Sequence, residues 1–213
     1  MSFITQPMAI EKRSMEIIAP YLENLDISPE AVKVFSRIIH AAGDPAYSEV
    51  IDIHPEAIRA GCQALYSGCH IYTDVEMVRT GINRRRLAEF GGEVHCLIAD
   101  AEVAAVAKRE GITRSMAAMR AFGDRLDGAV VAIGNAPTAL FEVLELIQHS
   151  GIRPALIVGV PVGFVGAAES KALLAETSPV PYITVKGTKG GSPIAAATVN
   201  ALLYMQDQGR YDG

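Results

Sequence analysis

Short apolar segments alternate with helix-like segments through most of this chain, and this alternation limits its fold more than any other feature. The later segments are apolar almost throughout, so they have no polar side to turn toward water. Strands of this kind are typical of a parallel sheet that helices cover on both faces. We therefore expect an α/β fold, a three-layer α/β/α arrangement with a mostly parallel sheet, and strands at residues 70–73, 93–98, 129–133, 155–158 and 182–185.

Helical periodicity and helix-end residues fill the intervals between these strands. Ser28 is a typical N-cap, Pro29 suits the first helical position, and Gly43 is a typical stop. The sequence predicts a single domain over residues 1–213, in which a helical N-terminal part, about residues 1–68, packs on the α/β part. The expected helices are residues 10–19, 28–42, 54–66, 75–79, 102–110, 115–126, 138–149, 167–176 and 194–205.

Composition excludes several classes of protein. No run of about 18 apolar residues is present, so no membrane span is expected. The first residues lack a basic flank before an apolar core, so no signal peptide is expected. The three cysteines, Cys62, Cys69 and Cys96, have no CxxC spacing. We expect them to be reduced and buried in a cytoplasmic protein, and we expect no protein-held metal.

The charge balance argues against polyanionic partners. The formal net charge is −5 and tryptophan is absent, so neither nucleic acid nor an anionic membrane is an expected partner. A local basic pocket for a small acidic molecule remains compatible with this charge.

Ligands of parallel α/β sheets bind at the carboxyl ends of the strands. The loops expected there are residues 73–74, 134–138, 159–166 and 186–192. The loop from Gly159 to Gly166 has the spacing G-x-x-x-G-x-x-G, whereas a dinucleotide fingerprint needs G-x-G-x-x-G. It can hold an anion on free backbone N–H groups or can simply be a tight turn. Lys186 and Lys189 flank a second glycine-rich turn, where they meet carboxylates or are solvated.

His40 is the best candidate for proton transfer. The apolar residues of its predicted helix lie within about 60° of Ala31, and His40 lies about 180° away from Ala31. It also falls in the last turn, where free carbonyl groups favour a protonated imidazole. The position fits general acid–base catalysis, and it equally fits an exposed histidine that complements a helix end.

Two further helix positions are unusual. Ser14 lies on the stripe of Ile10, Ile17 and Ile18, so its hydroxyl needs either its own helix carbonyl or a ligand as a partner. Arg114 follows the N-cap Thr113, and an arginine in a first turn is mildly unfavourable unless an anion lies there. The run 84–86 is basic, and a run this short is usually a solvated face.

Several long motifs together resemble the precorrin-8X methylmutase family, which includes cobalt-precorrin-8 methylmutases. The resemblance covers nearly the whole chain. Its strongest stretches are residues 131–140 (VAIGNAPTAL) and 159–171 (GVPVGFVGAAESK). It also rests on Arg13-Ser14, Arg37-Ile-Ile-His40, Asp74-Val-Glu-Met-Val, Thr113-Arg114-Ser115 and the turn at residues 186–192.

The resemblance implies an isomerase of cobalamin biosynthesis that moves a methyl group from C-11 to C-12 of a contracted tetrapyrrole. The product would be hydrogenobyrinate or its cobalt counterpart, cobyrinate. It further implies a cytosolic homodimer, an acidic tetrapyrrole as substrate and no separate cofactor. His40 would be the proton donor and acceptor. The candidate substrate-binding residues are Arg13, Ser14, Thr73, Asp74, Arg114, Ser115, Asn135 and Lys186.

Alternatives remain at this point. A non-catalytic corrinoid carrier would use the same arginines and loops. A nucleotide-dependent oxidoreductase is suggested by the loop at 159–166, although its spacing is wrong. A flat macrocycle also needs an apolar slot, for which Tyr72, Met77 and Phe164 are candidates, although each fits core packing equally well.

Overall fold

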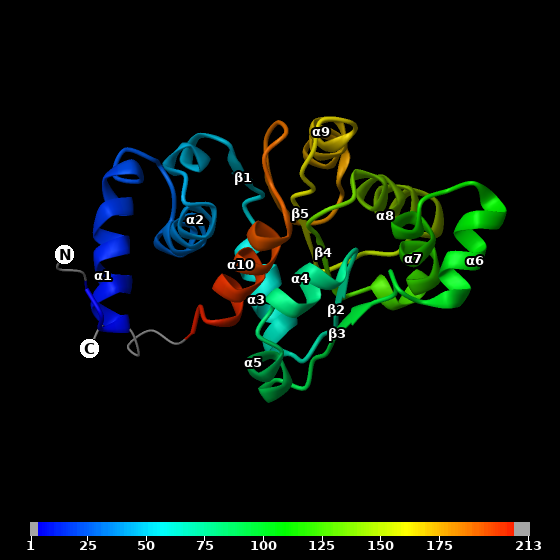
Figure 1. Ribbon diagram of the computed structural model, residues 1–213, viewed down its shortest axis with the longest axis horizontal. Helices are drawn as coiled ribbons and strands as arrows, with labels where there is room; N and C mark the ends of the chain where they lie inside the picture. The colour runs from blue at the N-terminus through cyan, green and yellow to red at the C-terminus, as the bar shows by residue number, and fades with distance from the viewer. Residues whose placement is uncertain (1–3, 207–213) are drawn as a thin grey trace.

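The computed structural model describes residues 4–206 and has a six-stranded sheet between two layers of helices (Figure 1). The strand order is β1-β6-β5-β4-β2-β3, and every neighbouring pair is parallel except β1 with β6. The expected three-layer fold with a mostly parallel sheet is confirmed. The strands are β1 (Ile51–Ile53), β2 (Ile71–Thr73), β3 (Val94–Cys96), β4 (Val130–Ile133), β5 (Leu156–Gly159) and β6 (Tyr182–Val185).

The two helical layers enclose separate cores. Val130 and Ala132 of β4 face one core, and Val131 and Ile133 face the other, which is the two-residue alternation of a strand buried on both sides. The first layer holds α3 (Ala57–Tyr66), α4 (Glu76–Gly81) and α10 (Ser192–Leu203), with α2 (Pro29–Ala42) packed on α10 and α1 (Pro7–Ile18) outermost. The second layer holds α6 (Ala101–Glu110), α7 (Arg114–Phe122), α8 (Pro137–Ser150) and α9 (Ala167–Thr177).

Helix α2 forms as its end residues predict. The Ser28 side chain accepts the N–H of Ala31 at 3.1 Å, and Pro29 occupies the first helical position. Gly43 ends the helix in the left-handed conformation, with φ of 62°. Its N–H donates to the carbonyl groups of Ile39 and His40 in the last turn. The capped helix therefore ends at a defined place, directly after His40.

Two elements were missed by sequence reasoning. The N-terminal part contains β1, which pairs antiparallel with β6 at the sheet edge, so this part is not purely helical. Three residues are too few to show an alternation of apolar and polar side chains. β1 is a strand because it pairs with β6. The basic run lies in α5 (Arg84–Glu89), capped by Asn83, whose side chain accepts the N–H of Arg86 at 3.0 Å. Arg84 and Arg85 are exposed.

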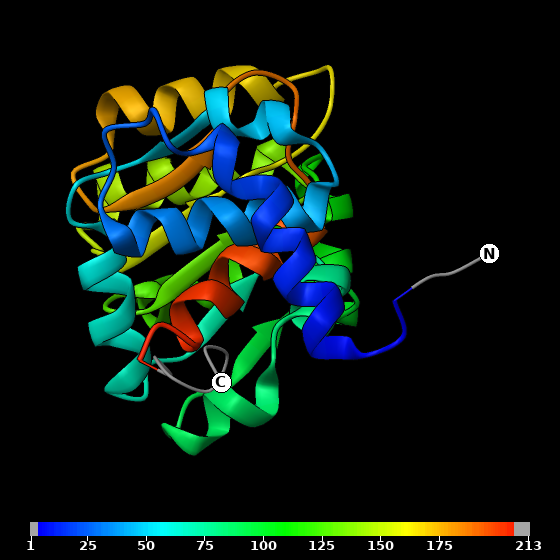
Figure 2. The ribbon, with the colours of Figure 1, turned by 90° about the vertical axis from the view of Figure 1, so that its left-hand side faces the viewer.

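The expected buried stripe on α1 is wrong in part. Ile18 is buried, but Ile10 and Ile17 are 45% and 54% exposed. Figure 2 shows α1 crossing the outside of α2, and Met15 with Ile18 makes the apolar contact with the core. Ile10 and Ile17 lie about 80–100° round the helix from Ile18, so one helical partner cannot cover all three.

No helix within residues 4–206 is long and apolar enough to cross a membrane. The three cysteines are free thiols, and they are half-buried rather than fully buried as expected.

Candidate active site

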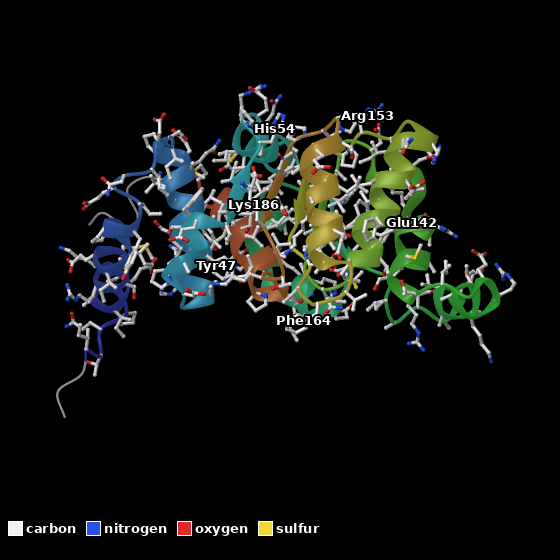
Figure 3. The ribbon with its side chains drawn as sticks, turned by 90° about the horizontal axis from the view of Figure 1, so that it is seen from above. Tyr47, His54, Glu142, Arg153, Phe164 and Lys186 are labelled. Atoms are coloured by element: carbon white, nitrogen blue, oxygen red, sulfur yellow. The ribbon has the colours of Figure 1, made fainter. Side chains whose placement is uncertain are left out.

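The carboxyl ends of the parallel strands lie along one edge of the molecule. In Figure 3, Tyr47 and Phe164 lie toward this edge, and His54 and Arg153 lie toward the opposite one. The loops after β4, β5 and β6 are joined there by backbone hydrogen bonds. The Val160 N–H donates to Ile133 at 2.9 Å and the Gly191 N–H donates to Val160 at 2.8 Å. These bonds make the three loops one continuous surface.

Asp74 lies where ligands of doubly wound sheets usually bind. The chain leaves β2 toward β3 and returns to β4 on the other side, so the strand order reverses between β2 and β4. The Asp74 side chain is fully buried in this gap. It accepts the N–H groups of Gly134, Asn135 and Ala136 at 3.0, 2.8 and 2.7 Å. The protein's own carboxylate thus occupies the N-terminus of α8.

Burial raises the pKa of Asp74, and the three backbone donors act in the opposite direction. Thr73 is equally buried, and its hydroxyl donates to the His95 carbonyl at 3.1 Å. Ser115 is buried at the start of α7. These three side chains are buried, whereas Asn135, whose N–H group Asp74 accepts, is exposed.

Arg114 is exposed at the first position of α7, as its place in the sequence predicts. The Thr113 side chain caps this helix by accepting the Met116 N–H at 3.2 Å. The Thr113 hydroxyl also lies 2.8 Å from that of Thr138, near the start of α8. This contact ties the start of α7 to the start of α8, so Arg114 stands at the same edge of the sheet as Asn135.

His40 is exposed in the last turn of α2, on the face opposite the core, as its helical position predicts. The two residues after it, Ala41 and Ala42, line an open hollow of about 490 Å³. The far side of this hollow is formed by Val162 of the loop after β5 and by residues 188–190 and 193–194. The hollow thus lies between the end of α2 and the glycine-rich loops, and His40 directly precedes its first lining residue in the sequence.

The turn after β6 contributes two lysines with different surroundings. Lys186 is exposed, and its Nζ lies 3.9 Å from Asp52, which leaves it available to an anion. Lys189 instead pairs with Asp44 and lies 5.1 Å over the ring of Tyr47. The hydrogen bond from Lys189 is the main cause that lowers the pKa of the Asp44 carboxyl group. Lys186 is thus the lysine of this turn that remains open to a ligand.

Arg13 and Ser14 lie on α1, outside the layer that covers the sheet. Arg13 is exposed and pairs with Glu16 at 3.0 Å. Ser14 is half-buried, and its hydroxyl donates to the Ile10 carbonyl at 2.9 Å. Of the two partners expected for this hydroxyl, the structure therefore shows the carbonyl of its own helix. Within residues 4–206, no hydrogen bond or ion pair joins these two residues, or Arg114, to His40.

Two charged residues with defined partners were not among the candidate site residues of the sequence analysis. Arg37, one turn before His40, pairs with Glu11 at 2.5 Å and so fastens α1 to α2. Lys171 is 1% exposed, and its ammonium group donates to the Lys189 carbonyl. Burial lowers the pKa of Lys171 to about 8. Both residues lie inside the long motifs, but no local pattern distinguishes a buried lysine from a surface one.

The three candidates for lining an apolar slot, Tyr72, Met77 and Phe164, differ in exposure. Tyr72 is 5% exposed and packs edge-to-face on Phe122, so it belongs to the core. Met77 and Phe164 are 66% and 93% exposed. The tip of the loop after β5, including Val165 beside Phe164, is therefore an apolar surface open to solvent.

A cluster of potential metal ligands lies away from this edge. Ligand atoms of His70, Glu93 and His95 lie within 4.8 Å of one another at the amino ends of β2 and β3. The Nδ1 atom of His70 already accepts the Glu93 N–H at 3.1 Å, which places the proton of a neutral ring on Nε2. The cluster is thus not a preformed metal site.

Comparison with known proteins places this geometry in a family. The family profile of precorrin-8X methylmutase matches residues 9–205. A cobalt-precorrin-8 methylmutase of Priestia megaterium is 42% identical over 98% of this chain and 92% of its own length. A precorrin-8X methylmutase of a Sinorhizobium species is 43% identical over 94% of this chain and 95% of its own length.

A solved structure agrees with the sequence comparisons. The precorrin-8X methylmutase of Thermus thermophilus superposes with a TM-score of 0.85 at 39% identity, covering 94% of this chain and 99% of that one. Sequence and fold agree over nearly the full length, and the chain therefore belongs to the precorrin-8X methylmutase family.

Proposed function

We propose that this protein moves a methyl group from C-11 to C-12 of precorrin-8X or cobalt-precorrin-8, giving hydrogenobyrinate or cobyrinate. The observation that carries the proposal is the exposed His40 in the last turn of α2, directly before two residues that line the hollow, in a chain of this family. Membership of the family makes the protein an isomerase of cobalamin biosynthesis.

His40 is the proposed proton donor and acceptor. In the methyl shift, the bond from the methyl group to C-11 breaks and a bond to C-12 forms within one molecule. A proton lent to the macrocycle near the migrating group polarises the ring, and it returns to the imidazole afterwards. No oxidant or net proton is needed. His40 lies in the last turn of α2, and a general acid–base group typically contributes about 10²–10⁴-fold to a rate.

The substrate's carboxylates are the proposed partners of the exposed polar residues. Arg114, Asn135 and Lys186 lie on three separate loops, before α7, after β4 and after β6, which suits a broad ligand with acidic side chains. Arg13 and Ser14 are proposed to contact the substrate from α1, in exchange for their present intrahelical bonds.

We assign a different role to the buried members of the predicted set. Thr73, Asp74 and Ser115 are proposed to position the binding loops rather than to touch the substrate, because each is 7% exposed or less. The exposed Met77 and Phe164 are proposed to contact the apolar face of the macrocycle. The same acidic macrocycle needs no separate cofactor, since its conjugated ring supplies the chemistry.

We also propose that the protein works in the cytoplasm, which its three free thiols support, since reducing compartments keep thiols unpaired.

The proposed activity is tested by the absorption spectrum of each substrate during incubation with the wild-type protein. The methyl shift extends the ring's conjugation, so turnover is expected to create new long-wavelength bands. Metal-free precorrin-8X and cobalt-precorrin-8 are compared in parallel. A ligand that binds without any spectral change in either form indicates a carrier, and the isomerase proposal then fails.

A homodimer is the proposed assembly, and α1 carries the observation that supports it. Ile10 and Ile17, seven residues apart on one face, are half exposed, and Tyr21, the last residue of the 3₁₀ turn η1 (Ala19–Tyr21) that follows α1, is 50% exposed. A second copy of the chain would cover this apolar face.

Ile17→Asp is expected to convert the dimer to a monomer, because an unpaired carboxylate would be buried at the interface. Light scattering after size-exclusion chromatography measures the mass, and Lys12→Asp, on an exposed position of the same helix, is the control. A monomeric wild-type protein, or a variant that stays dimeric, contradicts this interface.

A further inference from the structure

One peptide unit in the turn after β6 is held at both of its polar ends by buried side chains. The unit joins Lys189 to Gly190. Its carbonyl group accepts a hydrogen bond from the ammonium group of Lys171. Its N–H group donates to the hydroxyl of Tyr47 at 3.1 Å. A single peptide plane is therefore fixed in orientation by two side chains acting on opposite ends.

The two side chains come from opposite sides of the sheet. Lys171 lies on α9, which packs in the layer of α7 and α8. Tyr47 lies on the 3₁₀ segment η2 (Pro45–Glu49), directly after α2, and belongs to the other core. Figure 3 shows Tyr47 beside the end of α2, near the edge where the candidate site lies. We call these two hydrogen bonds, from Lys171 and to Tyr47, the clamp. The clamp thus joins the two helical layers through the turn between them.

The cost of burying Lys171 argues that its charge has a use. The side chain is 1% exposed, and burial lowers its pKa to about 8, so it is still protonated at neutral pH. Among residues 4–206, its hydrogen-bond partner is the neutral Lys189 carbonyl. A buried ammonium group without a carboxylate is costly, and an apolar side chain of the same length would fill this space without that cost.

The backbone leaves this peptide little freedom. Gly190 has a φ of 147°, and a Cβ atom there would lie 2.3 Å from the Val160 carbonyl oxygen. Tyr47, Lys189 and Gly190 all line the hollow between the end of α2 and the glycine-rich loops. A rotation of this one peptide would therefore reshape the wall that faces the substrate.

We propose that Lys171 and Tyr47 are positioning residues that fix the Lys189–Gly190 peptide and so hold the turn 186–191 in the orientation that receives the substrate's carboxylates. The inference rests on the proposed function for its ligand. The clamp itself is a property of the folded chain and can be measured without the ligand.

The test uses four variants: Lys171→Met, Tyr47→Phe, their combination and Tyr66→Phe. Tyr66 is the matched control, because its hydroxyl also bonds a backbone carbonyl, that of Leu202 at 2.8 Å, but at the far end of α10. Amide hydrogen exchange over residues 186–191 reports on the clamp, and the KM and kcat of the methyl shift report on the site.

Each clamp variant is expected to speed exchange in the turn and to raise KM about tenfold, with kcat within about threefold of the wild type. The double variant is expected to raise KM no more than about twofold beyond either single variant, because both residues act on one peptide. Tyr66→Phe is expected to match the wild type in both measurements.

Unchanged exchange in both single variants overturns the clamp. Faster exchange with an unchanged KM overturns its role in binding, since the bonds would then serve stability alone. A wild-type protein that binds the substrate but does not turn it over overturns the proposed function instead. In that case the Kd for the substrate replaces KM, and it is expected to rise by the same factor.

Discussion

His40→Ala is expected to lower kcat by about 10²–10⁴-fold while leaving substrate binding and folding nearly unchanged. The side chain is exposed and its helix core lies on the opposite face, so truncation removes no packing. Stopped-flow absorption of the long-wavelength product bands measures the rate, and a substrate titration measures Kd. A residue that acts in the transition state lowers kcat without weakening binding, as expected of a proton donor.

His149→Ala is the matched control for this experiment. His149 is also exposed in the last turn of a capped helix, α8, and it lies near Glu145 at 3.1 Å. Helix α8 starts at the carboxyl edge of the sheet, so its last turn lies away from the candidate site. Activity of His40→Ala within about tenfold of the wild type would remove the catalytic assignment, and an equal loss in His149→Ala would point to a general structural effect.

Asp74→Asn is expected to cost about 3–5 kcal/mol in the free energy of unfolding, the largest loss anticipated from an isosteric change in this chain. The carboxylate is fully buried and satisfies three backbone N–H groups at the start of α8. An asparagine offers one acceptor oxygen and turns an NH₂ group toward those same donors. At least one buried N–H group then loses its partner, and the charge at the helix N-terminus is lost as well.

Urea unfolding followed by circular dichroism measures this loss. Asp127→Asn is the control, because Asp127 is exposed and its side chain accepts a single backbone N–H, that of Arg153 at 2.6 Å. We expect less than about 1 kcal/mol for that change. A loss of similar size in the two variants would show that the three bonds to Asp74 do not fasten the loops after β2 and β4.

The pattern of residues was sufficient to predict most of the elements. Ser28, Pro29 and Gly43 act within a few residues of themselves, so the bounds of α2 follow from local chemistry alone. The buried parallel strands can be recognised in the sequence for a similar reason, because both faces of each strand must be apolar. The exposed place of His40 opposite the core of α2 follows from the helical period by itself.

Features that depend on a distant partner were not predictable in this way. β1 is a strand only because β6 presents an edge, and Ile10 and Ile17 are exposed because α2 covers another side of α1. Asp74 has the sequence context of a ligand-binding acid at a strand end. It becomes a buried structural group because the loop of β4 brings three N–H groups to it.

The sequence by itself determined the α/β class, the helix ends and the likeness to one family, because caps, periodicity and long motifs are local properties. Only the tertiary structure decided which of the candidate polar residues are exposed at the carboxyl edge and which are buried among the loops. Lys171 on α9 and Lys186 directly after β6 are both lysines. Lys171 is buried against a carbonyl group, whereas Lys186 is exposed. Burial is set by what the rest of the chain places against a side chain, and no local pattern records that.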